Sequence, residues 1–209
     1  HQLQHGIDAL PATAVNNQNS VIANRLSYYL DFKGPSFCVD TLCSSSLVAL
    51  HQARLSIENG ECEMAIVAGV HLQLDVAHFA ELNRLEVLSK DGVCRPFDAS
   101  ANGTVLGEGV GVVILKRQDL AEADDNRQWA TLMGSSVYHG GRSNGITAPD
   151  PVSQQRLVEQ CWAQAGIDGE QLGYIETHGT GTKLGDPIEL AGLSACTGEQ
   201  QLTTPCYPV

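Results

Sequence analysis

The sequence predicts an α/β fold that forms one layered domain. Some segments repeat apolar residues with helical spacing, whereas others are continuous apolar runs of strand length, and glycine or proline separates the two kinds. Hydrophobic residues make up 43% of the chain and charged residues 17%, with 21 glycines, which is typical of a globular protein with a buried core. The 209 residues suffice for one sizeable core.

The first predicted element is a helix over residues 20–30. Ser20 is a suitable N-cap. Gly34 and Pro35 then interrupt the helical pattern, and residues 36–40 have the character of a short strand. The apolar positions that share one face of this helix are Ile22, Leu26, Tyr29 and Leu30.

A second helix is predicted from Ser44 to the Asn59-Gly60 pair, which is a typical C-terminal stop. Residues 64–68 then form an apolar run of strand length. A strand, a helix and a strand in this order predict a βαβ unit in a parallel sheet that is covered on both faces. The apolar stripe of the helix consists of Leu47, Leu50, Ala53 and Ile57.

Further along, residues 109–115 are expected to form another buried strand. The acidic segment 119–125 is expected to be solvated, and residues 129–138 are a candidate strand. The stretch 139–149 is rich in Gly, Ser, Asn and Thr, which predicts a loop.

The most distinct helix is predicted after Asp150, with a proline at its first position and Gly166 at its end. Residues 172–177 are predicted to form a strand that ends at His178. A last helix is expected to start with Pro187, because Asp186 and Glu189 have the spacing of a capping box.

The charge and hydropathy of the chain argue against several classes of function. The net charge is −12 with only 12 Lys and Arg, and no basic stripe occurs, which disfavours nucleic-acid binding. No apolar run approaches the roughly 20 residues of a membrane helix, and no signal pattern is evident. We expect no membrane partner and a cytoplasmic location.

The cysteines indicate neither a zinc site nor a disulfide framework. They are odd in number and contain no C-x-x-C pair, so no metal is expected. Most of them are expected to be buried small hydrophobic residues. The seven are Cys38, Cys43, Cys62, Cys94, Cys161, Cys196 and Cys206.

Cys43 is the strongest candidate for chemistry. It lies where the predicted strand turns into a helix, so its thiol would face the positive N-terminal end of that helix. Such a position favours the reactive thiolate and offers a backbone N–H to a developing oxyanion. A buried cysteine at a tight turn is the competing interpretation.

His178 is the second candidate, because a flexible polar loop follows it. Gly179 and Gly181 allow close approach to a ligand, while Thr180 and Thr182 present hydroxyls. A thiol and a distant histidine are the ingredients of covalent acyl transfer. The competing interpretations are a core histidine and an ordinary turn.

Four motifs in order carry a family resemblance. The run Asp40-Thr41-Leu42-Cys43-Ser44-Ser45-Ser46-Leu47 resembles the active-site elbow of β-ketoacyl synthases, particularly the ketosynthase domains of modular type I polyketide synthases. The family usually has Ala where this chain has Leu42. The resemblance covers roughly residues 19–198, and the other motifs are Arg95-Pro96-Phe97-Asp98, Gly107-Glu108-Gly109 and His178-Gly179-Thr180-Gly181-Thr182 through Gly185-Asp186-Pro187-Ile188-Glu189.

The resemblance implies a thiolase-like layered αβαβα fold that is incomplete at both ends, with residues 1–209 forming a partial ketosynthase domain. By its position in the motifs, Cys43 is expected to be the acyl-accepting nucleophile and His178 one of two histidines that assist decarboxylation. Thr180 and Thr182 correspond to threonines that hydrogen-bond the phosphopantetheine arm. Phe97 corresponds to a segment near the dimer interface and the acyl pocket.

The implied reaction is acyl transfer from a carrier protein to the cysteine, then decarboxylative Claisen condensation with a malonyl-type thioester in polyketide or fatty acid elongation. The partners implied are an acyl carrier protein, acyl and malonyl-type thioesters and a second copy in a homodimer. No cofactor is expected to bind directly apart from the carrier's phosphopantetheine arm. The family's second histidine and its Gly-Phe-Gly loop fall after Val209, so we expect this chain alone not to complete a cycle.

Other functions remain open at this stage. A thiolase-like enzyme would use coenzyme A and a second cysteine, and a non-elongating ketosynthase would bind acyl chains without extending them. A papain-like hydrolase would need a third orienting residue, which no motif marks. The three serines after Cys43 and the loop after His178 favour the synthase.

Overall fold

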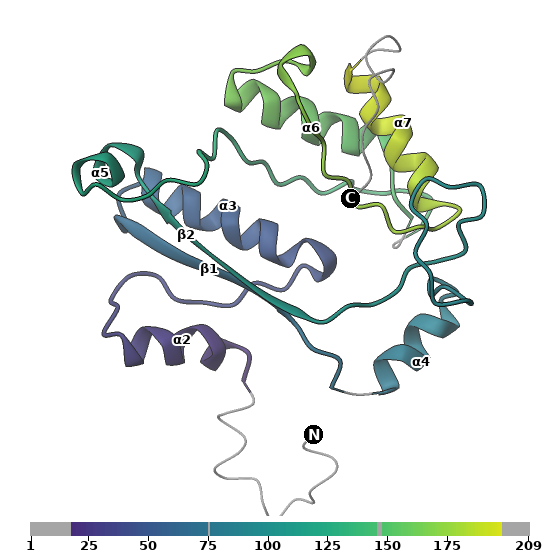
Figure 1. Ribbon diagram of the computed structural model, residues 1–209, viewed down its shortest axis with the longest axis horizontal. Coiled ribbons are helices and arrows are strands. Elements are labelled where there is room, and N and C mark those ends of the chain that lie inside the picture. Colours follow the sequence, from purple (N-terminus) through teal and green to yellow (C-terminus); the bar gives the residue numbers. More distant parts are fainter. Residues whose placement is uncertain (1–17, 75, 146–147, 198–209) are drawn as a thin grey trace, which may run out of the picture. The chain divides into compact units, whose positions relative to one another are not determined.

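A computed structural model describes residues 18–74, 76–145 and 148–197 (Figure 1). The chain divides into two units. Residues 1–69 and 110–129 form the first unit, and residues 70–109 and 130–209 form the second.

The first unit contains most of the helices and strands of the N-terminal half. The helices are α2 (Ser20–Tyr29), the 3₁₀ helix η3 (Leu42–Ser44), α3 (Ser45–Glu58) and α5 (Gln118–Ala123). The strands are β1 (Met64–His71) and β2 (Gly109–Lys116). The last two residues of β1 and the first residue of β2 belong to the second unit. The predicted helices at 20–30 and 44–60 and the strands at 64–68 and 109–115 are therefore confirmed. The acidic segment after β2 is partly helical.

β1 and β2 pair in a two-stranded sheet, and Figure 1 shows β2 returning alongside β1 in the opposite direction. The predicted parallel βαβ unit is wrong, because residues 36–40, its expected first strand, are not assigned as a strand, and β1 pairs with β2 instead. An apolar run predicts a strand but not the partner with which that strand pairs. The predicted burial of β2 is also wrong, because Val110 is 67% exposed and Ile114 is 63% exposed.

The start of α3 packs closely on β1. A methyl group added at Gly69, near the end of β1, would lie 3.1 Å from the Cβ of Ser46. The absent side chain therefore lets the first turn of α3 approach the strand. Ile57, Val67 and Ala121 are the buried apolar residues among the described part of this unit.

The second unit contains α4 (Val76–Arg84), α6 (Pro151–Ala165), the 3₁₀ helix η4 (Gly169–Gln171) and α7 (Gly185–Thr197). The helix predicted after Asp150 is confirmed: the Asp150 carboxylate accepts from Ser153 N at 2.9 Å, and Gly166 ends the helix with φ 67°. α6 packs against α7, where Gly192 lies so close that an added methyl group would sit 3.0 Å from Pro151 O.

Two further predicted strands are absent. Residues 129–138 and 172–177 belong to neither a helix nor a strand. A strand needs a neighbour that supplies a ladder of hydrogen bonds, and apolar character alone does not reveal that neighbour. The predicted loop at 139–149 is free of helix and strand at its described residues.

None of the helices in the described ranges is long and apolar enough to cross a membrane.

Candidate active-site elements

The Cys43 turn lies between an extended segment and α3. Cys43 is the middle residue of η3, and its free thiol is exposed. Leu42, directly before it, has φ 57°, a left-handed conformation that is uncommon for a leucine, and its side chain is 85% exposed. The turn therefore presents the thiol outward at the beginning of a helix.

Short polar side chains hold this turn. Ser45 Oγ donates to Leu42 O at 2.7 Å and accepts from Thr41 N at 2.9 Å. Ser44 Oγ lies 3.0 Å from Thr41 O and also 3.0 Å from Thr41 Oγ1. The serines that follow Cys43 thus bond backbone N–H and carbonyl groups of the turn that leads into the helix. Asp40 contributes as well, because its Oδ1 accepts from Leu42 N at 3.2 Å.

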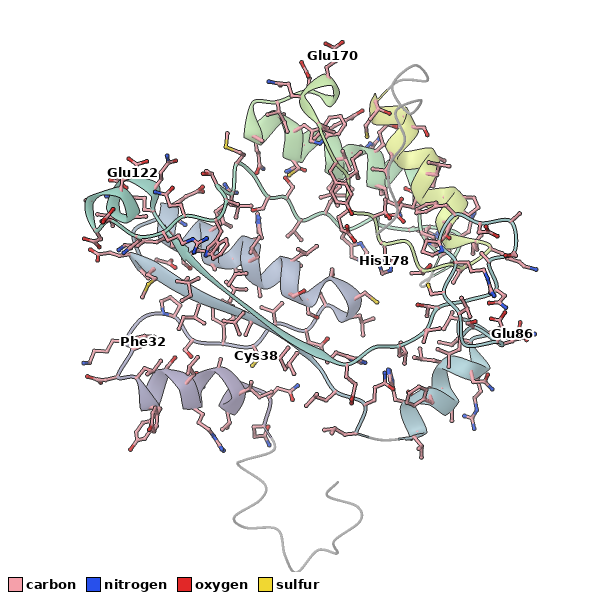
Figure 2. The ribbon with its side chains drawn as sticks, in the orientation of Figure 1. Phe32, Cys38, Glu86, Glu122, Glu170 and His178 are labelled. Carbon is pink, nitrogen blue, oxygen red and sulfur yellow. The ribbon has the colours of Figure 1, made fainter. Side chains whose placement is uncertain are left out.

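The second element is the loop from His178 to Asp186, which joins residues 172–177 to α7. Glu189, in the first turns of α7, reaches back to it: Oε1 accepts from His178 N at 2.6 Å and Oε2 accepts from Gly179 N at 2.9 Å. One carboxylate therefore fixes the backbone at the histidine. His178 is exposed. Its side chain is labelled in Figure 2.

Asp186 holds the other end of this loop. It is 3% exposed, and its Oδ1 accepts from Gly181 N at 3.1 Å. Its Oδ2 accepts from Phe97 N at 2.7 Å, which ties the loop to a segment 89 residues earlier. A buried carboxylate with several donors is an anchor whose loss leaves those donors unpaired.

The predicted capping box is therefore wrong. α7 begins at Gly185, so Asp186 and Glu189 lie inside the helix, and their carboxylates bind the preceding loop. The spacing of the two acids fits a capping box equally well, because a residue in the first turns of a helix can reach either its own N-terminus or the chain that leads into it.

The two threonines face each other within this loop. Thr180 Oγ1 and Thr182 Oγ1 lie 2.9 Å apart, and Thr182 Oγ1 also accepts from Gly185 N at 3.0 Å. Both residues are half-buried. Together with the fixed backbone of His178, they form a preorganised polar surface.

Two backbone features make this packing possible. Gly181 has φ 69°, and an added methyl group would lie 3.0 Å from Gly103 O and 3.1 Å from Arg95 N. Phe97 has φ 60°, which aims its N–H at Asp186. Glycine is thus required at 181 by both conformation and space.

A cleft of about 470 Å³ lies beside this loop in the second unit. Its polar lining consists of Asp98, Thr182, Lys183 and Asp186. The larger part of its wall is apolar, as is typical of ligand pockets. The apolar residues of the lining include Phe97, Ala101, Pro187 and Leu190.

The structure brings together three of the predicted site residues, His178, Thr180 and Thr182, on one loop. Cys43 belongs to the first unit and stands on its own turn. Sequence reasoning missed the anchoring roles of Asp186, Glu189 and Phe97. The signal was present, because both acids fall in the same motif as His178 and Phe97 falls in another.

The cysteines differ from expectation. None of the six in the described residues is buried, and Cys38, Cys43 and Cys94 are exposed. Desolvation, with a smaller effect of Glu61, raises the pKa of Cys62. Desolvation, with a smaller effect of Glu159, raises the pKa of Cys196. A raised pKa lowers the fraction of these two thiols that is thiolate at neutral pH. Cys206 lies outside the described residues.

Comparison with protein families gives two matches along the chain. Residues 2–121 match the N-terminal domain of β-ketoacyl synthases, and residues 129–207 match their C-terminal domain.

Similar proteins are large polyketide synthases. The chain is 50% identical over 179 residues to a phenolphthiocerol/phthiocerol polyketide synthase of Mycobacterium tuberculosis, an alignment that covers 86% of this chain and 10% of that protein. It is 50% identical over 172 residues to polyketide synthase PksM of Bacillus subtilis, covering 82% of this chain and 4% of that protein. The chain therefore spans a tenth or less of these two relatives.

The solved structures similar to this chain include ketosynthase domains. The ketosynthase from module 6 of the bacillaene synthase of Bacillus subtilis matches with a TM-score of 0.85 and 45% identity, over 87% of this chain and 33% of that one. The oxazolomycin ketosynthase domain OzmH KS7 of Streptomyces albus matches with a TM-score of 0.86 and 43% identity, over 90% of this chain and 32% of that one. The predicted thiolase-like α/β fold is thus confirmed, and this chain belongs to the β-ketoacyl synthase family.

Proposed function

We propose that this chain is part of a ketosynthase that extends an acyl chain by decarboxylative Claisen condensation in polyketide synthesis. The observation that carries the proposal is the exposed Cys43 thiol at the start of α3, in a turn supported by its neighbouring serines. Residues 1–209 would form the part of the ketosynthase domain that runs from the nucleophile turn into the second half of the domain.

In the first step the Cys43 thiolate attacks the carbonyl carbon of an acyl thioester that an acyl carrier protein delivers. The carbon–sulfur bond to the phosphopantetheine thiol breaks, and the acyl group becomes a thioester of Cys43. Thioester exchange is nearly balanced in energy, so the acyl group can leave again in the next step. The N-terminal end of α3 offers backbone N–H groups to the developing oxyanion.

In the second step a malonyl-type thioester on the carrier loses CO₂, and the electron pair of the broken bond forms an enolate. His178 stabilises the enolate oxygen by donating a ring N–H, and an oxyanion donor of this kind contributes roughly 2.7–4 kcal/mol. The enolate carbon attacks the acyl carbonyl on Cys43, the thiolate leaves, and the product is a β-ketoacyl thioester on the carrier.

Thr180 and Thr182 would bind the amide groups of the phosphopantetheine arm. Their support is the loop geometry: the two hydroxyls lie 2.9 Å apart on a backbone that Glu189 and Asp186 fix. The arm serves as the carrier of substrate, and a homodimer with an acyl carrier protein is the proposed working assembly.

The first test is intact-mass spectrometry after incubation with a short acyl-N-acetylcysteamine thioester, with a Cys43→Ala variant as control. The expected result is a stable mass increase of one acyl group that the variant lacks. Rapid hydrolysis to free acid without an adduct would support a hydrolase instead.

Condensation is tested next in the full-length protein with a malonyl-type carrier substrate. A β-ketoacyl product that disappears in a His178→Ala variant is expected. Acylation of Cys43 without any extension would identify a non-elongating ketosynthase.

A further inference from the structure

Residues 89–103 form a loop whose two ends are joined. Leu88 and Thr104 make an isolated parallel bridge, with Ser89 N donating to Thr104 O at 2.8 Å. Gly103 has φ 136°, and a methyl group added there would lie 2.4 Å from the carbonyl carbon of Leu88. A loop closed so tightly at its base behaves as one compact unit.

The Asp91 carboxylate organises the inside of the 89–103 loop. Its Oδ1 accepts from Ser89 Oγ at 2.8 Å, Asn102 Nδ2 at 3.1 Å and Val93 N at 3.4 Å. Arg95 Nη1 lies 2.9 Å from its Oδ2. Both ends of the loop and its middle therefore meet at one anionic group, and ionised acceptors make the stronger hydrogen bonds.

The other side of the 89–103 loop supports the loop from His178 to Asp186. Gly103 N donates to Gly181 O at 2.9 Å, and Phe97 N donates to Asp186 Oδ2 at 2.7 Å. Cys94 Sγ lies 3.6 Å from Thr180 O. These three contacts come from different parts of the 89–103 loop and reach the segment that carries both threonines.

We propose that Asp91 is a positioning residue for the condensation site. It touches none of the groups assigned to the reaction. Its carboxylate shapes the 89–103 loop, and that loop contacts the backbone at Thr180 and Gly181 and the carboxylate of Asp186, in the segment that carries His178 and both threonines. The inference rests on the proposed function and adds a residue to it that no motif singled out.

An Asp91→Asn substitution separates this role from general stability. The amide keeps one oxygen acceptor but loses the charge and the second oxygen, so the bonds to Ser89, Asn102 and Arg95 compete for it. The loop should then loosen while its base, which backbone groups close, stays in place.

The matched control is Asp119→Asn. Asp119 also pairs with an arginine: its carboxylate accepts from Arg117 Nε at 2.6 Å and from Nη2 at 2.9 Å. It belongs to the first unit, whereas the 89–103 loop belongs to the second. The same change of charge is therefore made without altering the contacts of that loop.

The experiment compares two half-reactions in the full-length protein. With Asp91→Asn we expect the KM for the carrier-bound malonyl-type substrate to rise at least tenfold. The rate at which a small thioester acylates Cys43 should stay within twofold of the wild-type rate. Asp119→Asn should leave this KM and this acylation rate unchanged. A Ser89→Ala variant removes a hydroxyl that also contacts Val93 and Asn102 but keeps the charge of Asp91, and its KM for the same substrate should rise less.

Hydrogen exchange supplies a readout independent of activity. The backbone amides of residues 178–186 should exchange at least tenfold faster in Asp91→Asn, with an unchanged thermal midpoint. Equal losses in both half-reactions together with a lowered midpoint would overturn the inference, as would unaltered exchange. If the wild type itself makes no β-ketoacyl product, the proposed function fails, and hydrogen exchange alone then decides the role of Asp91.

Discussion

Two carboxylates in α7 decide the conformation of the His178 loop. Glu189 accepts from the N–H groups of His178 and Gly179, and buried Asp186 accepts from those of Gly181 and Phe97. A carboxylate offers two acceptor oxygens, whereas an amide of the same size offers one oxygen and an NH₂ group that cannot accept. The backbone of the loop is therefore held by two acids of the helix that follows it.

Glu189→Gln should lower the rate of condensation at least tenfold. The amide retains one acceptor oxygen, so one of the two N–H groups at His178 and Gly179 loses its partner. Rates of β-ketoacyl product formation would check this in the full-length protein. Glu159→Gln is the matched control, since Glu159 accepts from the side chain of Gln155 on α6. An effect of equal size in both variants would contradict the assigned role of Glu189.

Burial should make the thiols of Cys62 and Cys196 less reactive than that of Cys43. Burial raises the pKa of the Cys62 and Cys196 thiols, so a smaller fraction of each is thiolate at neutral pH. Timed alkylation with iodoacetamide and peptide mass spectrometry should find both labelled more slowly than Cys43. Labelling of Cys62 or Cys196 ahead of Cys43 would refute this order.

Among the elements, α6 is the one whose boundaries the sequence marks fully. Asp150 caps its start and Gly166 ends it with φ 67°. Both signals are local, since the side-chain oxygen bonds a nearby N–H and only glycine adopts the left-handed conformation easily. The start of α7 is not marked by such local signals, because Asp186 and Glu189 bind segments outside the helix.

Gly166→Ala should lower the free energy of unfolding by about 1 kcal/mol, because alanine is strained in the left-handed backbone conformation. No atom lies within 4 Å of the added methyl group, so packing adds nothing to this cost. Gly173→Ala is the control, because Gly173 has equally open surroundings and no positive φ. Urea unfolding of the two variants should show a loss only for Gly166→Ala. Equal losses would show that φ does not decide the effect.

For the whole molecule, stability should depend on pH through paired carboxylates. Hydrogen bonds from the Ser100 side chain and backbone, chiefly the hydroxyl, lower the pKa of Asp98, and those from Ser153 do the same for Asp150. A lowered pKa means that the folded state favours the ionised form. The stabilisation is therefore present above the ordinary value of 3.8 and is lost as the pH falls below it.

Asp150→Asn tests this sign. Asparagine also caps helices, so the substitution removes the charge of residue 150 and keeps a capping oxygen. The variant should therefore be less stable than the wild type near neutral pH. The two should be equally stable at a pH well below the ordinary aspartate pKa. Urea unfolding at both pH values measures the difference. Ser153→Ala should show the same convergence, because it removes the hydroxyl that lowers the pKa. A stability difference that persists in acid would contradict this explanation.

The sequence by itself determined the features that depend on neighbours along the chain. These were the helices at 20–30, 44–60 and 150–166, the strands at 64–68 and 109–115, and the family motifs that select Cys43 and His178. Helical periodicity, caps and apolar runs are local, so they can be recognised without the fold.

Only the tertiary structure decided what depends on contacts distant in sequence. Residues 36–40 and 172–177 carry strand-like patterns but are not assigned as strands, because a sheet requires a second chain segment in register. Asp186 meets Phe97 across 89 positions, and Gly103 meets Gly181. No spacing rule connects such residues, since their proximity arises only when loops fold against each other.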